Sequence, residues 1–192
     1  HALDQRRTCG LRFAAAAFTN LSGDHLDYHG TLDNYRAAKA RLFAELPADA
    51  TAVVNRDDPS HAAMIANTPA KVLTYGLDPA ADVSARITKS TARGTFYRLR
   101  VGGHELVLEN AIVGRHNVYN ALTAAGLAHA MGIPPADIAS GLSSVRNVPG
   151  RLQRVPCEAA ADVFVDYAHT DDALRNVVSV LKPLAGQRLI VL

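Results

Sequence analysis

Several features are scarce in this 192-residue sequence, and each scarcity excludes a class of protein. Cysteine occurs only twice, at Cys9 and Cys157, without a CxxC pair, which argues against a disulfide scaffold and favours a reducing, cytoplasmic compartment. No run of about 18 uncharged apolar residues occurs, so no membrane-spanning helix or membrane partner is expected. The net charge is only +2 and basic residues are dispersed, so nucleic acid is not an expected partner.

Two phosphate-binding motifs are also missing. The sequence contains neither a Walker A motif, GxxxxGK[ST], nor a GxGxxG run. It begins at His1 without a methionine and ends on the strand-like run RLIVL. We therefore expect an internal fragment of a longer parent protein.

The apolar patterns predict a mixed α/β fold. Buried strands are expected within 11–19, at the start of 51–59 and over 70–76, and helices over 116–132 and 134–145. Residues 95–109 predict an antiparallel hairpin around Gly102–Gly103. In the expected register Leu99 faces Leu106, Tyr97 faces Leu108, and Arg100 faces Glu105 with the opposite charge.

A second α/β unit is expected near the end of the chain. Residues 162–192 read as strand, helix and strand, with Thr170 as the N-cap of the helix. Such a βαβ unit is too small to form a core by itself. We therefore expect a central domain over 1–150, with a Rossmann-like or P-loop-type sheet that lacks its N-terminal part. The truncated start of a second Rossmann-like domain follows over 151–192.

Lysine is rare here, with four lysines against sixteen arginines, and one of the four occupies an unusual place. A helix capped by Thr31 would place Lys39 in the apolar stripe formed by Tyr35, Phe43 and Leu46. The ordinary interpretation is a lysine that packs its stem on the core and extends its amine to water. The alternative is a desolvated amine, which could act as a base, form a Schiff base or capture CO2 as a metal-binding carbamate.

Other polar residues follow predicted strands or begin predicted helices. The run GDHLDYHG after the first strand contains His25 and offers imidazole and carboxylate ligands, although its spacing matches no closed zinc site and an ordinary solvated loop is the alternative. Asn117 lies at a helix start, either as a simple cap or near phosphate or a purine. Arg151 follows a glycine, either as a phosphate clamp or as a surface residue. Asp166 and His169 occupy a strand end, either at a nucleotide site or as capping residues.

Taken together and in order, these segments resemble the Mur ligase family. The resemblance is carried by HALDQRR, FTNLSGDHLDYHGTLDNYRAAKARLF, GRHNVYNALTAAG, PGRLQRV and VDYAHTDDAL, and it runs from residue 1 to about 192. It is strongest for the branch that adds the third residue of the peptidoglycan stem peptide. The family reads DYAHTPDAL where this chain has Asp171 in place of proline, a change that the first turn of a helix tolerates.

The resemblance implies a role for each candidate residue. Lys39 would be carbamylated and would hold Mg2+ together with His25, both at the catalytic centre. Gln5 and Arg7 would bind UDP-N-acetylmuramoyl-dipeptide. ATP would be bound by residues from both domains: Asn117, Arg151, Asp166 and His169.

The implied activity is ATP-dependent amide formation through an acyl phosphate, with diaminopimelate or lysine as the incoming amino acid. The parent is expected to be a monomeric cytoplasmic enzyme, and the fragment alone is expected to be inactive. Two alternatives remain. One is a folylpolyglutamate synthase-like ligase, and the other is a non-catalytic nucleotide-binding module that has lost its P-loop.

Overall fold

The computed structural model describes residues 2–22, 26–158 and 161–192. None of the helices in this part of the chain is long and apolar enough to cross a bilayer. The elements follow in the order β1 (Ala15–Phe18), α1 (Leu26–His29), α2 (Leu32–Ala44), β2 (Thr51–Asn55), α3 (His61–Ile65), β3 (Lys71–Gly76), β4 (Val83–Thr91), β5 (Gly94–Val101), β6 (His104–Asn110), α4 (Arg115–Ala130), α5 (Pro135–Ser144), β7 (Gln153–Val155), β8 (Val163–Val165), α6 (Asp171–Leu181) and the 3-10 helix η1 (Lys182–Leu184).

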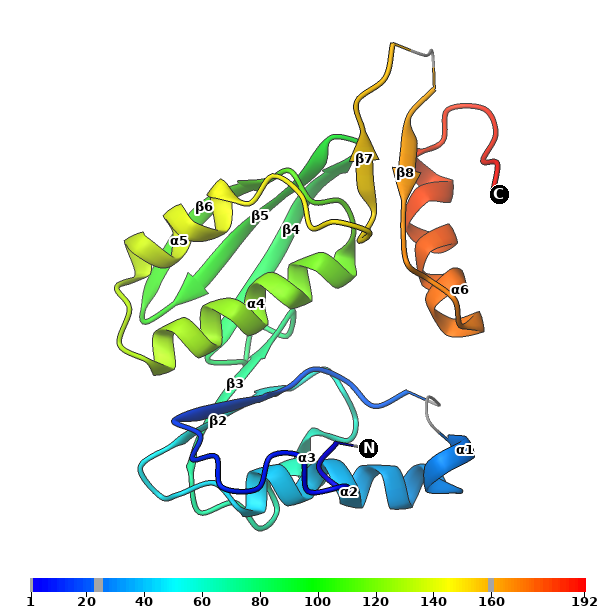
Figure 1. The fold of residues 1–192 in the computed structure, drawn as a ribbon. Coiled ribbons are helices and arrows are strands. Elements are labelled where there is room, and N and C mark those ends of the chain that lie inside the picture. Colours follow the sequence, from blue (N-terminus) through cyan, green and yellow to red (C-terminus); the bar gives the residue numbers. More distant parts are fainter. Residues whose placement is uncertain (1, 23–25, 159–160) are drawn as a thin grey trace.

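The main sheet has the strand order β1-β2-β3-β4-β5-β6 (Figure 1). Strands β1 to β4 pair in parallel, and β4, β5 and β6 pair antiparallel. The predicted mixed α/β fold with a small antiparallel region is confirmed. Strand β4, which the sequence patterns did not predict, joins the parallel strands to the hairpin.

The predicted hairpin register is confirmed, but its charge pairing differs. Gly102 and Gly103 both have positive φ, 56° and 80°, as a tight two-residue hairpin loop requires. Arg100 is in register with Glu105, yet Glu105 forms its ion pair with Arg98 at 2.7 Å. Arg100 instead donates to the carbonyl oxygen of Ala81 at 2.7 Å and to the hydroxyl of Ser84, its partner on β4, at 3.1 Å.

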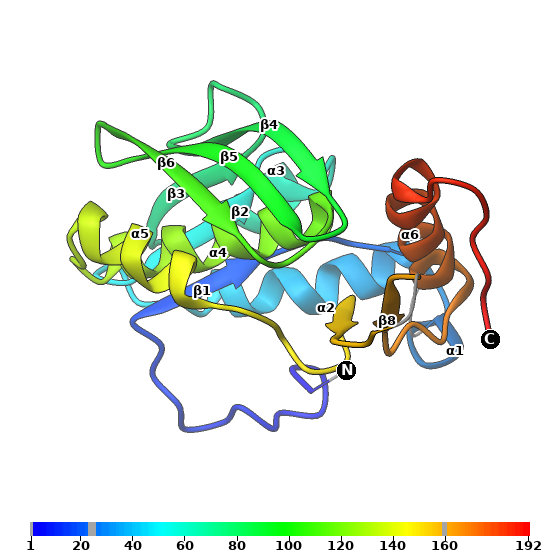
Figure 2. The same ribbon diagram turned by 90° about the horizontal axis from the view of Figure 1, so that it is seen from above.

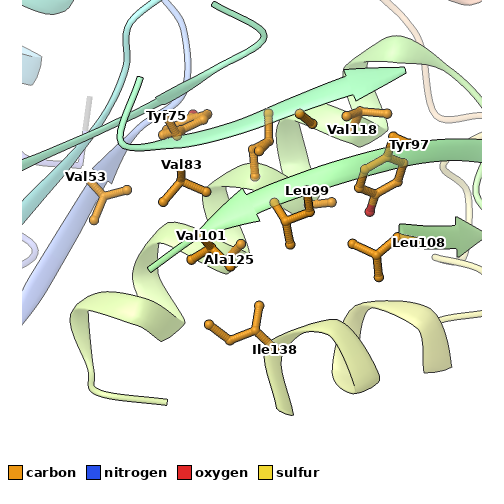
Figure 3. Packing of buried hydrophobic residues seen from close by; sticks show 13 residues of the cluster. Val53, Tyr75, Val83, Tyr97, Leu99, Val101, Leu108, Val118, Ala125 and Ile138 are labelled. Carbon is orange, nitrogen blue, oxygen red and sulfur yellow. The ribbon is translucent and has the colours of Figure 1, made fainter. Parts of the chain in front are cut away.

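Helices cover both faces of the parallel strands and create two cores. Val53 packs with α4 and α5 on one face, in the cluster shown in Figure 3. Its neighbours Ala52 and Val54 point to the opposite face and pack with Phe43 of α2 and with α3. This alternation is the period-2 pattern of a strand buried on both faces.

Two predicted helix caps are confirmed. The Thr31 hydroxyl oxygen accepts a hydrogen bond from the Asn34 N–H at 3.2 Å, at the start of α2. The Thr170 hydroxyl accepts one from the Ala173 N–H at 3.3 Å, at the start of α6. Both threonines thereby satisfy a backbone donor that the helix itself cannot pair.

The C-terminal unit differs from the predicted strand, helix and strand. Strand β8 pairs antiparallel with β7 in a separate two-stranded sheet, and α6 follows. Residues 188–192 form no strand, and Ile190 and Val191 are 62% and 63% exposed. The prediction of a last strand is wrong because an apolar run forms a strand only when a neighbouring strand pairs with it. Figure 2 shows this segment running along the outside of α6.

Candidate active site

Lys39 lies on α2, and two groups hold its amine. Its Nζ donates to the main-chain carbonyl oxygen of Asn20 at 3.3 Å and lies 4.8 Å from the centre of the Tyr35 ring. Tyr35 is one helical turn earlier, and helical side chains lean toward the N-terminus, so the lysine side chain extends back toward the ring. Asn20 follows β1, so the amine lies near the carboxyl end of a parallel strand, where α/β folds bind ligands.

The Lys39 side chain is half-buried, while Tyr35 and Phe43 of the same helix are buried. The predicted place of Lys39 on the apolar stripe of α2 is confirmed, and its amine reaches a main-chain carbonyl at the edge of the core. The physical reason is that an ammonium group needs hydrogen-bond acceptors, which the apolar stripe does not supply.

His25, the second predicted magnesium ligand, lies outside the described residues, as does Asp24 of the same run. Within the described part of the run, 26–30, α1 ends at His29, which is 9% exposed. The His29 ring stacks on the Tyr35 ring, with centres 4.8 Å apart and planes 20° apart. The run GDHLDYHG is thus joined to the helix that carries Lys39 through an aromatic contact.

Gln5 and Arg7 lie in a series of turns over residues 2–10, and both are exposed. Their neighbour Asp4 connects these turns to the helices. The Tyr28 hydroxyl donates to the Asp4 carboxylate at 2.9 Å, and Arg41 of α2 forms a hydrogen-bonded ion pair with it. The hydrogen bonds from Tyr28 and Arg41 hold the pKa of the Asp4 carboxyl below its usual range. The same contacts border an open cavity of about 560 Å³ between the turns and α2.

Asn117 is buried in the first turn of α4. Its Nδ2 donates to the Val113 carbonyl oxygen at 2.8 Å, and its Oδ1 accepts from Asn120 at 3.1 Å. Gly114, with φ 103°, is the N-cap residue, so the simple interpretation of Asn117 as the cap is wrong. The amide of Asn117 keeps one hydrogen and one lone pair beyond these bonds.

Arg151, Asp166 and His169 gather around Tyr167. The Arg151 guanidinium carbon is 5.9 Å from the centre of the Tyr167 ring, and His169 Nδ1 is 2.9 Å from the Tyr167 carbonyl oxygen. Asp166 fixes the backbone on both sides of this group, because its carboxylate accepts from the Leu152 N–H at 2.7 Å and from the Ala168 N–H at 2.8 Å.

His116 connects this group to the start of α4. Burial lowers the pKa of His116, and the charges of Asp166 and Arg151 act on it in opposite directions. The packing is close here: a Cβ on Gly114 would lie 2.9 Å from the His116 ring and 3.0 Å from Val180 of α6. The structure therefore brings the helix start of Asn117 together with Arg151 and Asp166.

A further polar network at the strand ends was missed by the sequence patterns. The Asp57 carboxylate, just after β2, accepts from the Leu77 N–H at 2.6 Å and from the Tyr119 hydroxyl at 2.7 Å. Burial and the bond to Asp57 raise the pKa of Tyr119, which keeps its hydroxyl protonated as a donor. The network ties the ends of β2 and β3 to α4, and the acidic run NRDDP after a predicted strand was the available signal.

The described residues contain no cluster of three or more histidine, cysteine, aspartate or glutamate side chains that could hold a metal by themselves. A carbamate on Lys39 would add a carboxylate beside the Asn20 carbonyl oxygen. Both groups are hard oxygen donors of the type that Mg2+ prefers, with substrate phosphates and water completing the shell. The residues at this position therefore fit a magnesium ion that substrates help to bind.

Comparisons with known proteins agree on one family. The model of the Mur ligase middle domain matches residues 1–128. A UDP-N-acetylmuramoyl-L-alanyl-D-glutamate–2,6-diaminopimelate ligase of Parabacteroides distasonis is 44% identical over 179 residues, which cover 93% of this chain and 36% of that protein.

Solved structures give the same result. A UDP-N-acetylmuramoyl-L-alanyl-D-glutamate–2,6-diaminopimelate ligase superposes with a TM-score of 0.78 at 34% identity, over 95% of this chain and 38% of that chain. A mutant of L. casei FPGS superposes with a TM-score of 0.73 at 22% identity, over 93% and 44%, which shows a shared fold. The first two relatives are matched over little more than a third of their length, 36% and 39%. By the match to its middle domain and the identity to these relatives, this chain belongs to the Mur ligase family.

Proposed function

We propose that this chain is part of an ATP-dependent ligase that adds the third amino acid, diaminopimelate or lysine, to UDP-N-acetylmuramoyl-L-alanyl-D-glutamate. The observation that carries this proposal is the identity of 40–44% to three diaminopimelate ligases over 93–99% of this chain. The domain division at residues 150 and 151 belongs to the same proposal, and the separate β7-β8 sheet supports it.

The chemistry has two steps. The carboxylate of the UDP-linked dipeptide attacks the γ-phosphorus of ATP, which gives an acyl phosphate and releases ADP. The amine of the incoming amino acid then attacks the acyl carbon, and the tetrahedral intermediate expels inorganic phosphate to leave the amide. Both steps need cations around the phosphate groups and a site that excludes water.

The nucleotide-side residues would share the work of holding ATP. Asn117 would present the remaining hydrogen-bonding capacity of its amide to the adenine. Arg151 would neutralise phosphate charge, and Asp166 would bind the ribose in addition to fixing its own loop. His169 lies beside them with its Nδ1 engaged by Tyr167, so its Nε2 is the nitrogen that could face a nucleotide.

On the other side, Gln5 and Arg7 would bind the UDP-linked substrate. Lys39, as a carbamate, and His25 would hold Mg2+, which when bound offsets the negative charge of the γ-phosphate. The position of Lys39 near the carboxyl end of β1 and next to the Asn20 carbonyl supports this assignment.

The two alternatives are weaker. The likeness to FPGS, at 22% identity, supports a common fold and not folate as a substrate. A non-catalytic module would have no need for a lysine amine held between a ring and a carbonyl oxygen at the strand ends. Neither alternative is favoured by a specific contact in the described residues.

The test is a turnover assay on the complete gene product that contains these 192 residues. ADP release should depend on UDP-N-acetylmuramoyl-L-alanyl-D-glutamate, on Mg2+ and on one diamino acid. Diaminopimelate and lysine, supplied separately, identify the amino acid, and a folate with glutamate tests the rival ligase. ADP release that depends on folate, or that occurs with none of these substrates, would contradict the proposal.

A further inference from the structure

His29 is buried in a way that its hydrogen bonds do not explain. It is 9% exposed, and its Nε2 is buried without a hydrogen-bond partner in the part of the chain that the structure describes. An unpaired buried nitrogen costs free energy, so another interaction must keep the ring in place.

The interaction that keeps His29 in place is aromatic. Its ring stacks on Tyr35 at 4.8 Å and 20°, and it meets the Tyr28 ring edge-on at 4.9 Å and 82°. The loop is also closed by Asn34, whose Nδ2 donates to the His29 carbonyl oxygen at 3.0 Å. His29, which precedes α2, therefore packs against the Tyr35 ring of that helix.

Tyr35 in turn contacts Lys39. It is buried, at 8% exposure, and the lysine Nζ lies 4.8 Å from its ring centre, so the ammonium form of Lys39, before a carbamate forms, is within the range of a cation–π contact. A ring that is stacked on one neighbour and buried in a helix face has few alternative rotamers. The Tyr35 ring, on the same helix, therefore restricts the direction of the Lys39 side chain.

We propose that His29 and Tyr35 are positioning residues for Lys39: His29 fixes the Tyr35 ring, and the ring directs the lysine amine toward the carboxyl end of β1. The contacts explain why one flexible lysine reaches a defined position. Only the effect of that position on turnover rests on the proposed function. A free lysine loses rotamer entropy when it is ordered, and the ring reduces that cost at the moment of ligand binding.

The test reads the position of Lys39 directly. In the protein labelled with 13C-lysine, the ε-methylene protons of Lys39 should resonate upfield of those of Lys71, because a proton over an aromatic face is shielded by the ring current. The signal is assigned by Lys39→Arg. An unshifted Lys39 signal in the unsubstituted protein would overturn the proposal without any variant being needed.

Matched substitutions then separate the effect of each aromatic ring from the effect of the side-chain volume. Tyr35→Phe and His29→Phe keep both rings and should retain the upfield shift, whereas Tyr35→Leu should abolish it and His29→Ala should reduce it. Thermal unfolding of each variant shows whether the fold is retained. A shift that persists in Tyr35→Leu would contradict the positioning role.

Turnover of the complete gene product gives the second readout. Tyr35→Leu should lower kcat by roughly tenfold with a smaller change in the KM for ATP, and Tyr35→Phe should stay within about threefold of the unsubstituted enzyme. A normal kcat in Tyr35→Leu would overturn the positioning role and leave the ligase proposal intact. Absence of ligase turnover in the unsubstituted protein, with the upfield shift present, would overturn the proposed function and leave the ring stack standing.

Discussion

At the scale of single residues, the candidate site combines charges that have partners with charges that lie exposed for a ligand. Arg154 forms a double hydrogen bond with Asp162, at 2.6 and 2.8 Å, and so has its charge satisfied within the protein. Arg151, three residues earlier, is exposed and lies against the Tyr167 ring. The difference between these two arginines makes a direct test of the nucleotide site.

Arg151→Ala in the complete gene product should raise the KM for ATP or lower kcat by roughly tenfold or more, because a charge-assisted phosphate contact is lost. The measurement is steady-state ADP release at varied ATP. Arg154→Ala is the matched control and should change neither constant by more than about twofold, since exposed ion pairs contribute little. Unchanged constants for Arg151→Ala would remove Arg151 from the site.

His116 predicts a pH dependence of stability. Its folded pKa is lowered by burial, so the folded state binds fewer protons than the unfolded state, whose histidine titrates near pH 6.5. The stability it supports is complete above about pH 6.5 and is lost as the pH falls through the folded pKa. Urea unfolding between pH 7.5 and 5 should show this loss, and His116→Gln should flatten it; an equal slope in both proteins would refute it.

At the scale of elements, segments with a cap, a turn signal or an apolar period were predicted, and short or polar strands were not. The caps Thr31 and Thr170 and the hairpin around Gly102–Gly103 were predicted because their signals lie within a few residues. Strand β4 was missed although a two-residue turn joins it to β5, because its second half, 88–91, is polar and carries no apolar alternation. Strand β7 has only three residues, too few for a periodic pattern. The apolar run at 188–192 was wrongly predicted as a strand because apolar character alone does not supply a pairing strand.

The same distinction applies to the candidate site. The stripe of Tyr35, Lys39 and Phe43 was predicted from helical periodicity, and α2 places the Lys39 amine over the buried Tyr35 ring. The contact of Lys39 with Asn20, and the stack of His29 on Tyr35, depend on how a loop returns to the helix. Such contacts follow from tertiary packing, which residue spacing along the chain does not determine.

Helix packing supplies an element-scale prediction from two glycines. A Cβ on Gly126 of α4 would lie 2.7 Å from Val53 Cγ1 of β2, whereas a Cβ on Gly141 of α5 would meet nothing within 4 Å. Gly126→Ala should therefore destabilise the protein by about 1–3 kcal/mol through overpacking. Gly141→Ala should stabilise it by about 0.5–1 kcal/mol through helix propensity. Chemical denaturation measures both, and a stabilising Gly126→Ala would contradict the observed packing.

At the scale of the whole molecule, the candidate residues occupy two places in one fold. One group surrounds Lys39 near the carboxyl end of β1, and the other surrounds Tyr167 and the start of α4. The second group includes the boundary proposed at 150/151, where the Tyr167 N–H donates to the Gly150 carbonyl oxygen at 2.8 Å. A nucleotide bound there would contact both proposed domains, which is the arrangement that lets domain closure exclude water from the reaction.

The central claim is that Lys39 carries a carbamate, and 13C NMR of the protein equilibrated with 13C-bicarbonate near neutral pH tests it most directly. We predict a carbamate carbon signal in the complete gene product that disappears in Lys39→Ala and persists in Lys89→Ala. Lys89 is the matched control because its amine also lies near an aromatic ring, 5.9 Å from that of Phe96 on β5. A spectrum without a carbamate signal, or with one that survives in Lys39→Ala, would contradict the account.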